Sequence, residues 1–529
     1  MSFSIGKVSL STILLGFILL LSLFLVACSN SNDSSDNKSK NEVKGGTKTA
    51  ANTDSSPQAG GNIVVAIPQD LDFLDPHLAE AAGTREIMFN IFEGLLKANT
   101  KGGLDPAIAE SYTISDDGLT YTFKLRQGIV FHNGKELTSE DVLYSYTKLA
   151  GLKTGKAIYE TFANVASIEA PDKQTVVIAL KEKEASFLTA LTAAVIPAGY
   201  EDSNKNPVGT GPFQFEKYSA GQNIKLKKNE NYYIKGLPYL DGVEFRILTD
   251  QEAAFLALQS GELDIYPRIG TEKVEQLTSG FESISNPQNL VQLLAFNNKV
   301  KPFNDLKVRQ AINYAINVDE IIEGVALGKG TKIGSNLSPV LNQYYNDTLE
   351  ELYPTDIEKA KQLLKEAGLA DGFKFTITVP SVYPFHVDTA QVIAYQLEQV
   401  GIKATIETVE WGVWLDRVYN GRDYETTIIG LDGKLDPYEI LSRYHSTAKN
   451  NFLNFKNTKL DEVLIKAKSE VDEATRVELI KEAQKYIAED AAAVYIMDPN
   501  TNVAFKDTIK GYQSYPIYVQ DMASVYISQ

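Results

Sequence analysis

Residues 371–409 contain the pattern that most restricts how this chain can fold. Apolar residues dominate 373–379, as in a buried strand, and a helix is expected over 388–400, where Gly401 stops it. A second strand is expected over 402–409. Two strands joined by one helix at this spacing form a right-handed parallel crossover. The sequence therefore predicts an α/β fold.

Strand and helix patterns alternate through the rest of the chain from Gly61 onward. Thr355-Asp-Ile-Glu358 has the form of a capping box and predicts a helix from there to Gly368. A chain of 529 residues is too long for one core, so we expect two or three lobes, with ligands at strand ends or between lobes. Further strands are expected at 63–67 and 121–125, and further helices at 305–317, 458–470 and 475–490.

The N-terminus has the form of a lipoprotein signal peptide. Lys7 precedes an apolar stretch at 8–27, and residues 25–28 read Leu-Val-Ala-Cys, a lipobox in which the sulfur of Cys28 takes a diacylglycerol. A membrane-anchor helix ending in Cys28 is the alternative, but the stretch is short for a span and lacks basic flanks after it. We expect residues 1–27 to be cleaved and the lipid to hold the chain on the outer face of the bacterial cytoplasmic membrane.

Composition and charge limit the partners of the mature chain. The formal net charge is −17, and removing Lys7 with the signal peptide makes it more negative, which speaks against nucleic acid or an anionic surface. Cys28 is the only cysteine, so no disulfide is expected in the mature fold. Residues 28–60 are almost devoid of apolar side chains and are interpreted as the lipidated cysteine and a flexible tether. An exported chain has no ATP supply, which leaves capture, adhesion or extracellular hydrolysis.

The sequence carries none of the short motifs that mark common catalytic or metal sites. It has no Gly-x-Ser-x-Gly elbow, no His-Glu-x-x-His and no Walker loop. Gly209-Thr-Gly-Pro-Phe213 is interpreted as a tight turn, because Pro212 removes an amide that a phosphate cradle would use. We expect no catalytic residue, no metal and no cofactor, although scattered carboxylates leave a surface-anchored hydrolase as an alternative. The four histidines have no metal-ligand spacing: His77, His132, His386 and His445.

A series of motifs covers nearly all of the chain after the tether. As a set they are highly specific, and the chain resembles the solute-binding proteins of peptide and nickel ABC importers, extracytoplasmic family 5. The motifs are Leu74–Pro76, Phe92–Leu95, Leu104–Tyr112, Ser115–Arg126, Gly128–Gly134, Thr138–Val142, Pro207–Phe213, Gly261–Ile265, Val308–Ile316, Gln396–Ile402 and Trp411–Gly421.

This resemblance implies a two-lobed, periplasmic-binding-protein-like α/β fold with a Venus-flytrap cleft and a hinge of two crossing strands. The crossing strands are expected near 290–298 and 493–505. The expected lobes are lobe I at 61–294 plus 500–529, with an inserted subdomain at about 83–205, and lobe II at 295–499. Residues of the Arg126–Gly134 region, including His132, are expected to fix a turn rather than touch ligand.

The resemblance also implies an anchor for a peptide α-ammonium in the segment 430–437. Asp432 is the better match and Asp436 the alternative, and the segment is one residue shorter than in typical dipeptide binders. A carboxylate suits this role because an ammonium supplies three donors. The competing interpretation is that Asp436-Pro437 only starts a turn and that Asp432 is solvated.

Tyr383 stands where dipeptide binders carry an arginine for the ligand carboxylate. A phenol cannot form the bidentate contact of a guanidinium, so strict dipeptide specificity is in doubt. Peptides amidated at the C-terminus are therefore expected to bind nearly as well as free acids. If they do not, another cation such as Arg417 or Arg443 must hold the carboxylate.

Aromatic side chains complete the expected ligand site. Tyr383, Phe385 and Trp411 are candidates for the cleft wall, whereas Trp414 is either a fourth or part of a helix core. His386 either contacts a metal chelate, as in nickel-importing relatives, or has a hydrogen-bonded structural role.

The resemblance implies a monomeric substrate-binding lipoprotein that is not an enzyme. It would capture oligopeptides in the interlobe cleft and deliver them to an ABC permease in the membrane. The alternative within the same fold is a protein that binds nickel, a metallophore or another small solute.

Overall fold

The computed structural model describes residues 57–79 and 81–528. The expected signal peptide, Cys28 and most of the expected tether lie outside these residues. Gly60 N donates a hydrogen bond to Tyr239 O at 2.8 Å, and Gly61 N donates to Asp241 Oδ2 at 2.9 Å. The chain is thus already attached to the fold at the last residue of the expected tether. Within the described part, no helix combines the length and apolar character needed to cross a bilayer.

The first group of strands contains the predicted crossover. β15 and β16 pair in parallel with α9 (Pro384–Leu397) between them in sequence, which confirms the crossover. The helix begins at Pro384 rather than at residue 388, because proline suits the first turn of a helix, where its missing N–H is not needed. The strands of this group are β13 (Leu290–Phe296), β14 (Gly330–Lys332), β15 (Lys374–Pro380), β16 (Lys403–Val409) and β17 (Thr426–Asp432).

Helices cover both faces of this group of strands. Successive side chains of β13 point to opposite faces, so Leu293 packs into one apolar cluster and Leu294 into another. One cluster holds α6 (Leu306–Ala315), α7 (Val318–Ala326), α8 (Ile357–Glu366) and α9. The other holds α11 (Pro437–Leu441), α12 (Thr458–Ser469) and α13 (Glu473–Glu489). The helices expected at 305–317, 458–470 and 475–490 are confirmed within a few residues.

The predicted capping box of α8 is wrong by one residue. Asp356, not Thr355, caps the helix, and its carboxylate accepts the Lys359 N–H at 2.8 Å. The Thr355 hydroxyl instead donates to Ile316 O at 3.3 Å. Aspartate caps a helix as well as threonine does, so the pattern alone could not choose between neighbouring residues.

The second group of strands contains the predicted strand at 63–67. β1 pairs in parallel with both β10 and β11, and β9 joins β10 to β8 in antiparallel pairs. The strands are β1 (Asn62–Ile67), β8 (Phe213–Ser219), β9 (Asn223–Lys228), β10 (Gly242–Ile247), β11 (Ile265–Pro267) and β12 (Phe281–Pro287). The helices α1 (Ala82–Met88), α4 (Gln251–Gln259) and α5 (Thr271–Val274) belong with them.

A separate four-stranded sheet precedes β8 in the sequence. Its antiparallel order is β4-β5-β7-β6, and α2 (Ser139–Ala150) and α3 (Phe187–Ala190) pack with it around Tyr146, Phe162 and Phe187. The strands are β4 (Ala109–Ile114), β5 (Thr120–Leu125), β6 (Val165–Asp172) and β7 (Thr175–Leu180). All lie within the segment expected as the inserted subdomain.

The glycines of the 209–213 segment serve close packing. A Cβ atom on Gly209 would lie 2.0 Å from Ile91 O, so no larger residue fits there. His132 Nε2 donates to Gly211 O at 3.0 Å, and burial lowers the pKa of His132 to about 4. The contact between His132 and the 209–213 segment therefore has a structural role.

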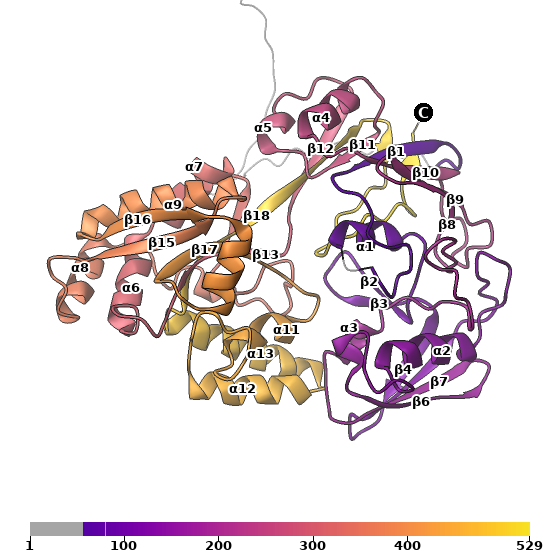
Figure 1. Cartoon of the computed structure of the whole chain (residues 1–529), viewed down its shortest axis with the longest axis horizontal. Helices are drawn as coiled ribbons and strands as arrows, with labels where there is room; N and C mark the ends of the chain where they lie inside the picture. The colour runs from indigo at the N-terminus through magenta and orange to yellow at the C-terminus, as the bar shows by residue number, and fades with distance from the viewer. Residues whose placement is uncertain (1–56, 80, 529) are drawn as a thin grey trace, which may run out of the picture. The chain divides into compact units, whose positions relative to one another are not determined.

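One strand joins the two groups into a twelve-stranded sheet (Figure 1). In β18 (Ala493–Lys506), residues 493–499 pair with β13 and β14, and residues 500–506 pair with β11 and β12. We call the β11 side, with the four-stranded sheet, lobe I, and the β13 side lobe II. The chain passes between the lobes at β18 and at the turn between β12 and β13.

Buried polar groups fix the junction of these crossing strands. The Asp498 carboxylate of β18 accepts the N–H groups of Gln288 at 3.1 Å and Asn289 at 2.9 Å, and also the hydroxyl of Ser338. Asn289 has a φ of 61° and donates from Nδ2 to Lys434 O at 3.1 Å and Pro516 O at 3.0 Å. The turn between the lobes is thus held from both sides.

Candidate functional site

Asp432 is the last residue of β17 and is exposed. Its Oδ1 accepts a hydrogen bond from the hydroxyl of Tyr518 at 3.2 Å, which connects lobe II to the C-terminal segment of lobe I. Oδ2 accepts no hydrogen bond from any residue that the structure describes. Burial, and next the charge of Asp432, raise the pKa of Tyr518 to about 12, so this phenol stays a donor at neutral pH. Oδ2 can therefore accept a hydrogen bond from a cationic group of a ligand.

Asp436 makes structural contacts, in line with the competing interpretation that Asp436-Pro437 starts a turn. It is 4% exposed and caps α11 by accepting the Tyr438 N–H at 2.8 Å. Its other oxygen forms an ion pair with Arg476 at 2.6 Å. Although burial acts in the opposite direction, this pairing raises the pKa of Arg476 above its usual value. A carboxylate with both oxygens engaged has no place for a ligand ammonium.

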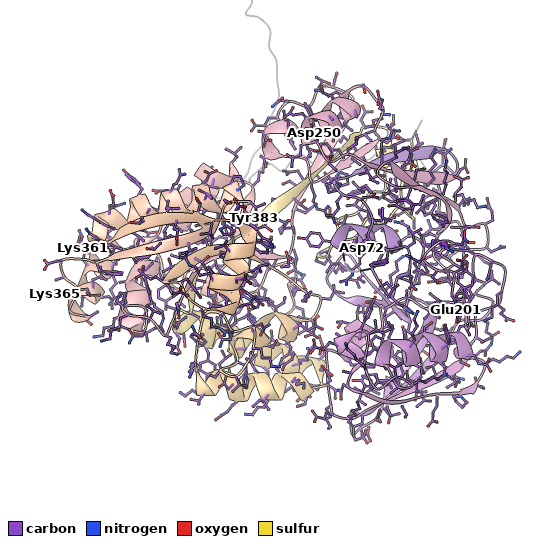
Figure 2. All side chains as sticks on the ribbon, viewed as in Figure 1. Asp72, Glu201, Asp250, Lys361, Lys365 and Tyr383 are labelled. Carbon is purple, nitrogen blue, oxygen red and sulfur yellow. The ribbon has the colours of Figure 1, made fainter. Side chains whose placement is uncertain are left out.

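Two exposed aromatic rings lie together at the ends of lobe II strands. Tyr383, labelled in Figure 2, precedes α9 and is 41% exposed, and Trp411 follows β16 and is 38% exposed. Their rings meet edge to face with centroids 5.6 Å apart. β15, β16 and β17 are parallel, so Tyr383, Trp411 and Asp432 all follow the carboxyl ends of neighbouring strands. Such ends are a common place for ligands in α/β proteins.

Trp414 is buried behind Trp411 and does not form part of this surface. It is 2% exposed, and its ring stacks on Trp411 with a centroid distance of 5.2 Å and an interplanar angle of 6°. Its indole N–H donates to Thr427 Oγ1 at 2.9 Å. Of the two roles weighed for Trp414, the buried helix position is the one observed.

His386 is a structural hydrogen-bonding residue. It is 7% exposed, and its Nε2 accepts the Gly430 N–H at 3.0 Å, so the ring proton must lie on Nδ1. Nδ1 lies 3.0 Å from Nε2 of Gln292, which also donates to Thr389 Oγ1 at 2.9 Å. Burial lowers the pKa of His386 to about 4, and neither nitrogen is left for a metal. The neighbouring Phe385 packs partly buried against the α6–α9 cluster.

Of the two arginines proposed to replace the missing carboxylate receptor, Arg417 is ion-paired and Arg443 makes a single local hydrogen bond. Arg417 donates to both carboxylate oxygens of Glu407 and, at 3.4 Å, to Thr378 Oγ1. Arg443 donates from Nε to Ile440 O at 3.3 Å, within its own helical turn. The guanidinium of Arg417 is thus occupied by Glu407 in this structure.

Two residues of lobe I outside the predicted site form a chain of contacts that leads to Asp432. Tyr518 bonds Asp432, and the guanidinium of Arg268 lies over the Tyr518 ring, 5.1 Å from its centroid. Arg268 also pairs with the buried Glu86 of α1. No local pattern marks Arg268, because its partners are far away in the sequence; only its position just after the Gly261–Ile265 motif hints at it.

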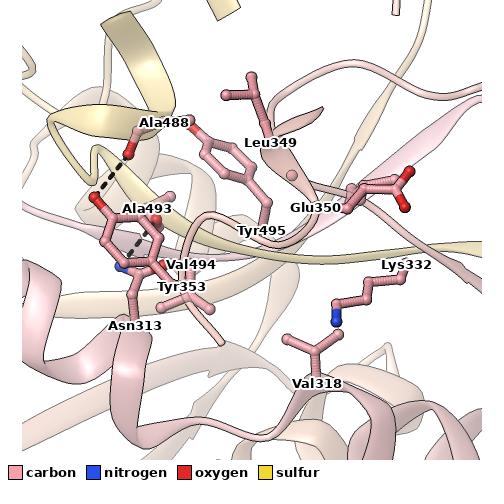
Figure 3. A pocket seen from close by; sticks show the side chains of 12 residues that line it. Asn313, Val318, Lys332, Leu349, Glu350, Tyr353, Ala488, Ala493, Val494 and Tyr495 are labelled. Atoms are coloured by element: carbon pink, nitrogen blue, oxygen red, sulfur yellow. Dashed lines mark hydrogen bonds between the residues drawn. The ribbon is translucent and has the colours of Figure 1, made fainter. Parts of the chain in front are cut away.

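The hollow shown in Figure 3 is lined by residues of lobe II alone. It lies beside α6 and β18, where Asn313 donates to Ala493 O and Tyr353 to Ala488 O. Among the described residues, no three His, Cys, Asp or Glu side chains gather as metal ligands would.

Comparison with known proteins gives one family match. The model of the bacterial extracellular solute-binding proteins, family 5 (middle region), matches residues 103–452. The chain is 30% identical over 453 residues to a dipeptide-binding protein of Escherichia coli, covering 78% of this chain and 84% of the relative. It is 31% identical over 453 residues to heme-binding protein A of Haemophilus influenzae, covering 78% and 82%.

A solved structure extends the likeness to the fold. The periplasmic binding protein DppA from Helicobacter pylori, in complex with the peptide STSA, superposes with a TM-score of 0.71 at 30% identity. The match covers 89% of this chain and 99% of that one. The expected fold class, a two-lobed α/β binding-protein fold, is confirmed.

Proposed function

Because the chain belongs to family 5 of the bacterial extracellular solute-binding proteins, we propose that it captures short peptides between its lobes for an ABC importer. The observation that carries this proposal is Asp432, an exposed carboxylate at the end of β17 with one oxygen that no described residue contacts. A relative and a structural neighbour that bind a dipeptide and the peptide STSA support the same ligand class.

The chemistry around Asp432 suits a free peptide amine. An ammonium offers three donors, and Asp432 Oδ2 supplies an acceptor for one of them. Tyr383 and Trp411 give a flat apolar wall that side chains of different shape can pack on, which fits a binder of several peptides. The Trp414 ring stacks on Trp411 and stabilises that wall from inside lobe II, whereas the ring of Phe385 contacts His386.

Capture requires the lobes to close on the peptide. The proposed lobes are residues 61–294 with 500–529, carrying an inserted subdomain at about 83–205, and residues 295–499. Both chain crossings between them lie at the junction held by Asp498 and Asn289. A monomeric protein anchored by lipid at Cys28 to the outer face of the cytoplasmic membrane would then release the peptide to a permease.

The test is the identity of what the protein carries. The chain lacking residues 1–28 is purified from cells, denatured, and its released small molecules are identified by mass spectrometry. Several short peptides are expected. A single non-peptide mass, a nickel signal or a heme absorption band would reject peptide capture and leave the family unaffected.

A further inference from the structure

Arg268 directly follows β11 of lobe I, and its backbone has an uncommon conformation. Its φ is 58°, a left-handed conformation that is uncommon for a residue with a long side chain. The side chain remains 34% exposed although its partner Glu86 is only 1% exposed. A strained backbone that presents a partly open guanidinium often marks a functional position.

The guanidinium of Arg268 has donors to spare. Nη2 donates to Glu86, whereas Nε and Nη1 have no acceptor among the residues that the structure describes. An arginine carries five N–H donors in a fixed planar array that matches a carboxylate. Burial lowers the pKa of Arg268, which reflects its partial removal from water. The unpartnered donors are therefore available in a partly desolvated place.

Arg268 and Asp432 lie on either side of the same tyrosine. The guanidinium covers the Tyr518 ring at 5.1 Å, and the hydroxyl of that ring reaches Asp432 at 3.2 Å. A cation from lobe I and an anion from lobe II thus contact the same tyrosine side chain. An extended peptide advances about 3.3–3.6 Å per residue, so one or two residues have about the length of a tyrosine side chain.

We propose that Arg268 receives the terminal carboxylate of a short zwitterionic peptide whose α-ammonium lies at Asp432. This assignment rests on the proposed function and names its preferred ligands, dipeptides and similarly short zwitterions. It replaces the expectation, drawn from Tyr383, that amidated peptides bind as well as free acids. The carboxylate receptor is supplied by lobe I instead of by the position of Tyr383 in lobe II.

The alternative role for Arg268 is to neutralise the buried Glu86. Replacing Arg268 alone would leave that carboxylate unpaired, so loss of folding could be mistaken for loss of binding. The double variant Glu86→Gln/Arg268→Gln removes both charges together and keeps the side chains polar. Arg246→Gln is the matched control, because Arg246 is also a lobe I arginine, pairs with Glu244 at 3.1 Å and has a side chain 31% exposed.

The experiment is calorimetric titration of the chain lacking residues 1–28 with three probes: Ala-Phe, Ala-Phe amide and Ser-Thr-Ser-Ala. Unfolding temperatures verify that each variant is folded. Wild type and Arg246→Gln are expected to bind Ala-Phe at least tenfold more tightly than its amide. The double variant is expected to bind acid and amide equally, with the affinity for the acid reduced at least tenfold.

Two results overturn the inference and leave peptide capture intact: wild type binds acid and amide equally, or a folded double variant still prefers the acid. Binding of Ser-Thr-Ser-Ala without Ala-Phe overturns the assigned ligand length. If wild type binds none of the three peptides, both this inference and the proposed function fail.

Discussion

At the scale of single residues, one exposed carboxylate is expected to control the affinity for peptides. Asp432→Ala removes the partner of the ligand ammonium and is expected to weaken Ala-Phe binding by about 2–4 kcal/mol, roughly 30-fold or more. The change in the free energy of unfolding should be small, because Asp432 is exposed and makes one hydrogen bond. Calorimetric titration measures the first quantity and urea denaturation the second.

Asp371→Ala is the control for this prediction. Asp371 is also an exposed aspartate of lobe II, but it precedes β15, and β15 runs parallel to β17. It therefore lies at the amino ends of these strands, whereas Asp432 lies at their carboxyl ends. Equal affinities of wild type and Asp432→Ala would remove Asp432 as the anchor.

The two stacked tryptophans are expected to respond differently to truncation. Trp414→Ala removes a side chain that is 2% exposed and should lower the free energy of unfolding by about 3–5 kcal/mol. Trp411→Ala removes an exposed ring and should cost about 1 kcal/mol of stability, while weakening peptide binding at least several-fold. Urea denaturation and titration of both variants check this. If Trp411→Ala binds peptides normally, this ring is no part of the site.

At the scale of helices and strands, the sequence predicts elements well where one local pattern decides them. The crossover of β15, α9 and β16 follows from apolar runs and a terminating glycine, and its parallel pairing is confirmed. The predicted start of α9 and the predicted cap of α8 are wrong by a few residues. The preferences for helix starts allow Pro384 and Asp356 as well as the residues predicted from the pattern.

The candidate site was predictable only in its lobe II half. Asp432, Tyr383 and Trp411 follow strand ends and lie in motifs of the resemblance. Tyr518 and Arg268 become neighbours of Asp432 only through long-range packing, which no local pattern encodes. The buried ion pair between Asp436 and Arg476 could not be predicted for the same reason.

The junction of β13 and β18 should make stability depend on pH. Burial raises the pKa of Asp498 from 3.8 to about 6, against the opposing effect of its hydrogen bonds. The folded protein therefore holds this proton more tightly than the unfolded chain, so the free energy of unfolding falls as the pH rises from about 4 to 6. The contribution of this residue is about 3 kcal/mol.

Asp498→Asn has no such proton to lose and should show a flatter dependence of stability over that range. Glu93 and Glu439, whose pKa values burial also raises, contribute the same slope to both proteins, so the difference between them isolates Asp498. Urea denaturation at pH 4, 5 and 6 provides the comparison. If the free energy of unfolding depends on pH equally in wild type and variant, the raised pKa of Asp498 is contradicted.

At the scale of the whole molecule, the lobes also touch at places other than the Tyr518–Asp432 contact. Ala185 N donates to Lys468 O at 2.9 Å, and Thr189 Oγ1 donates to Glu439 Oε1 at 3.3 Å, which connects α3 of lobe I to α11 of lobe II. The covalent links between the lobes are confined to the β13–β18 junction. Contacts such as that of Ala185 can therefore form and break as the lobes close and open.

A peptide that contacts both lobes should favour the closed form and protect these distant contacts. Hydrogen exchange followed by mass spectrometry should show slower exchange at the Ala185 amide when saturating Ala-Phe is present. The helix α8, which packs only within lobe II, serves as the internal reference and should not change. Local binding without closure predicts slower exchange only in segments near Asp432 and Trp411. Unchanged exchange at Ala185 would therefore show that the peptide binds to lobe II alone, without the hinge motion that capture between lobes requires.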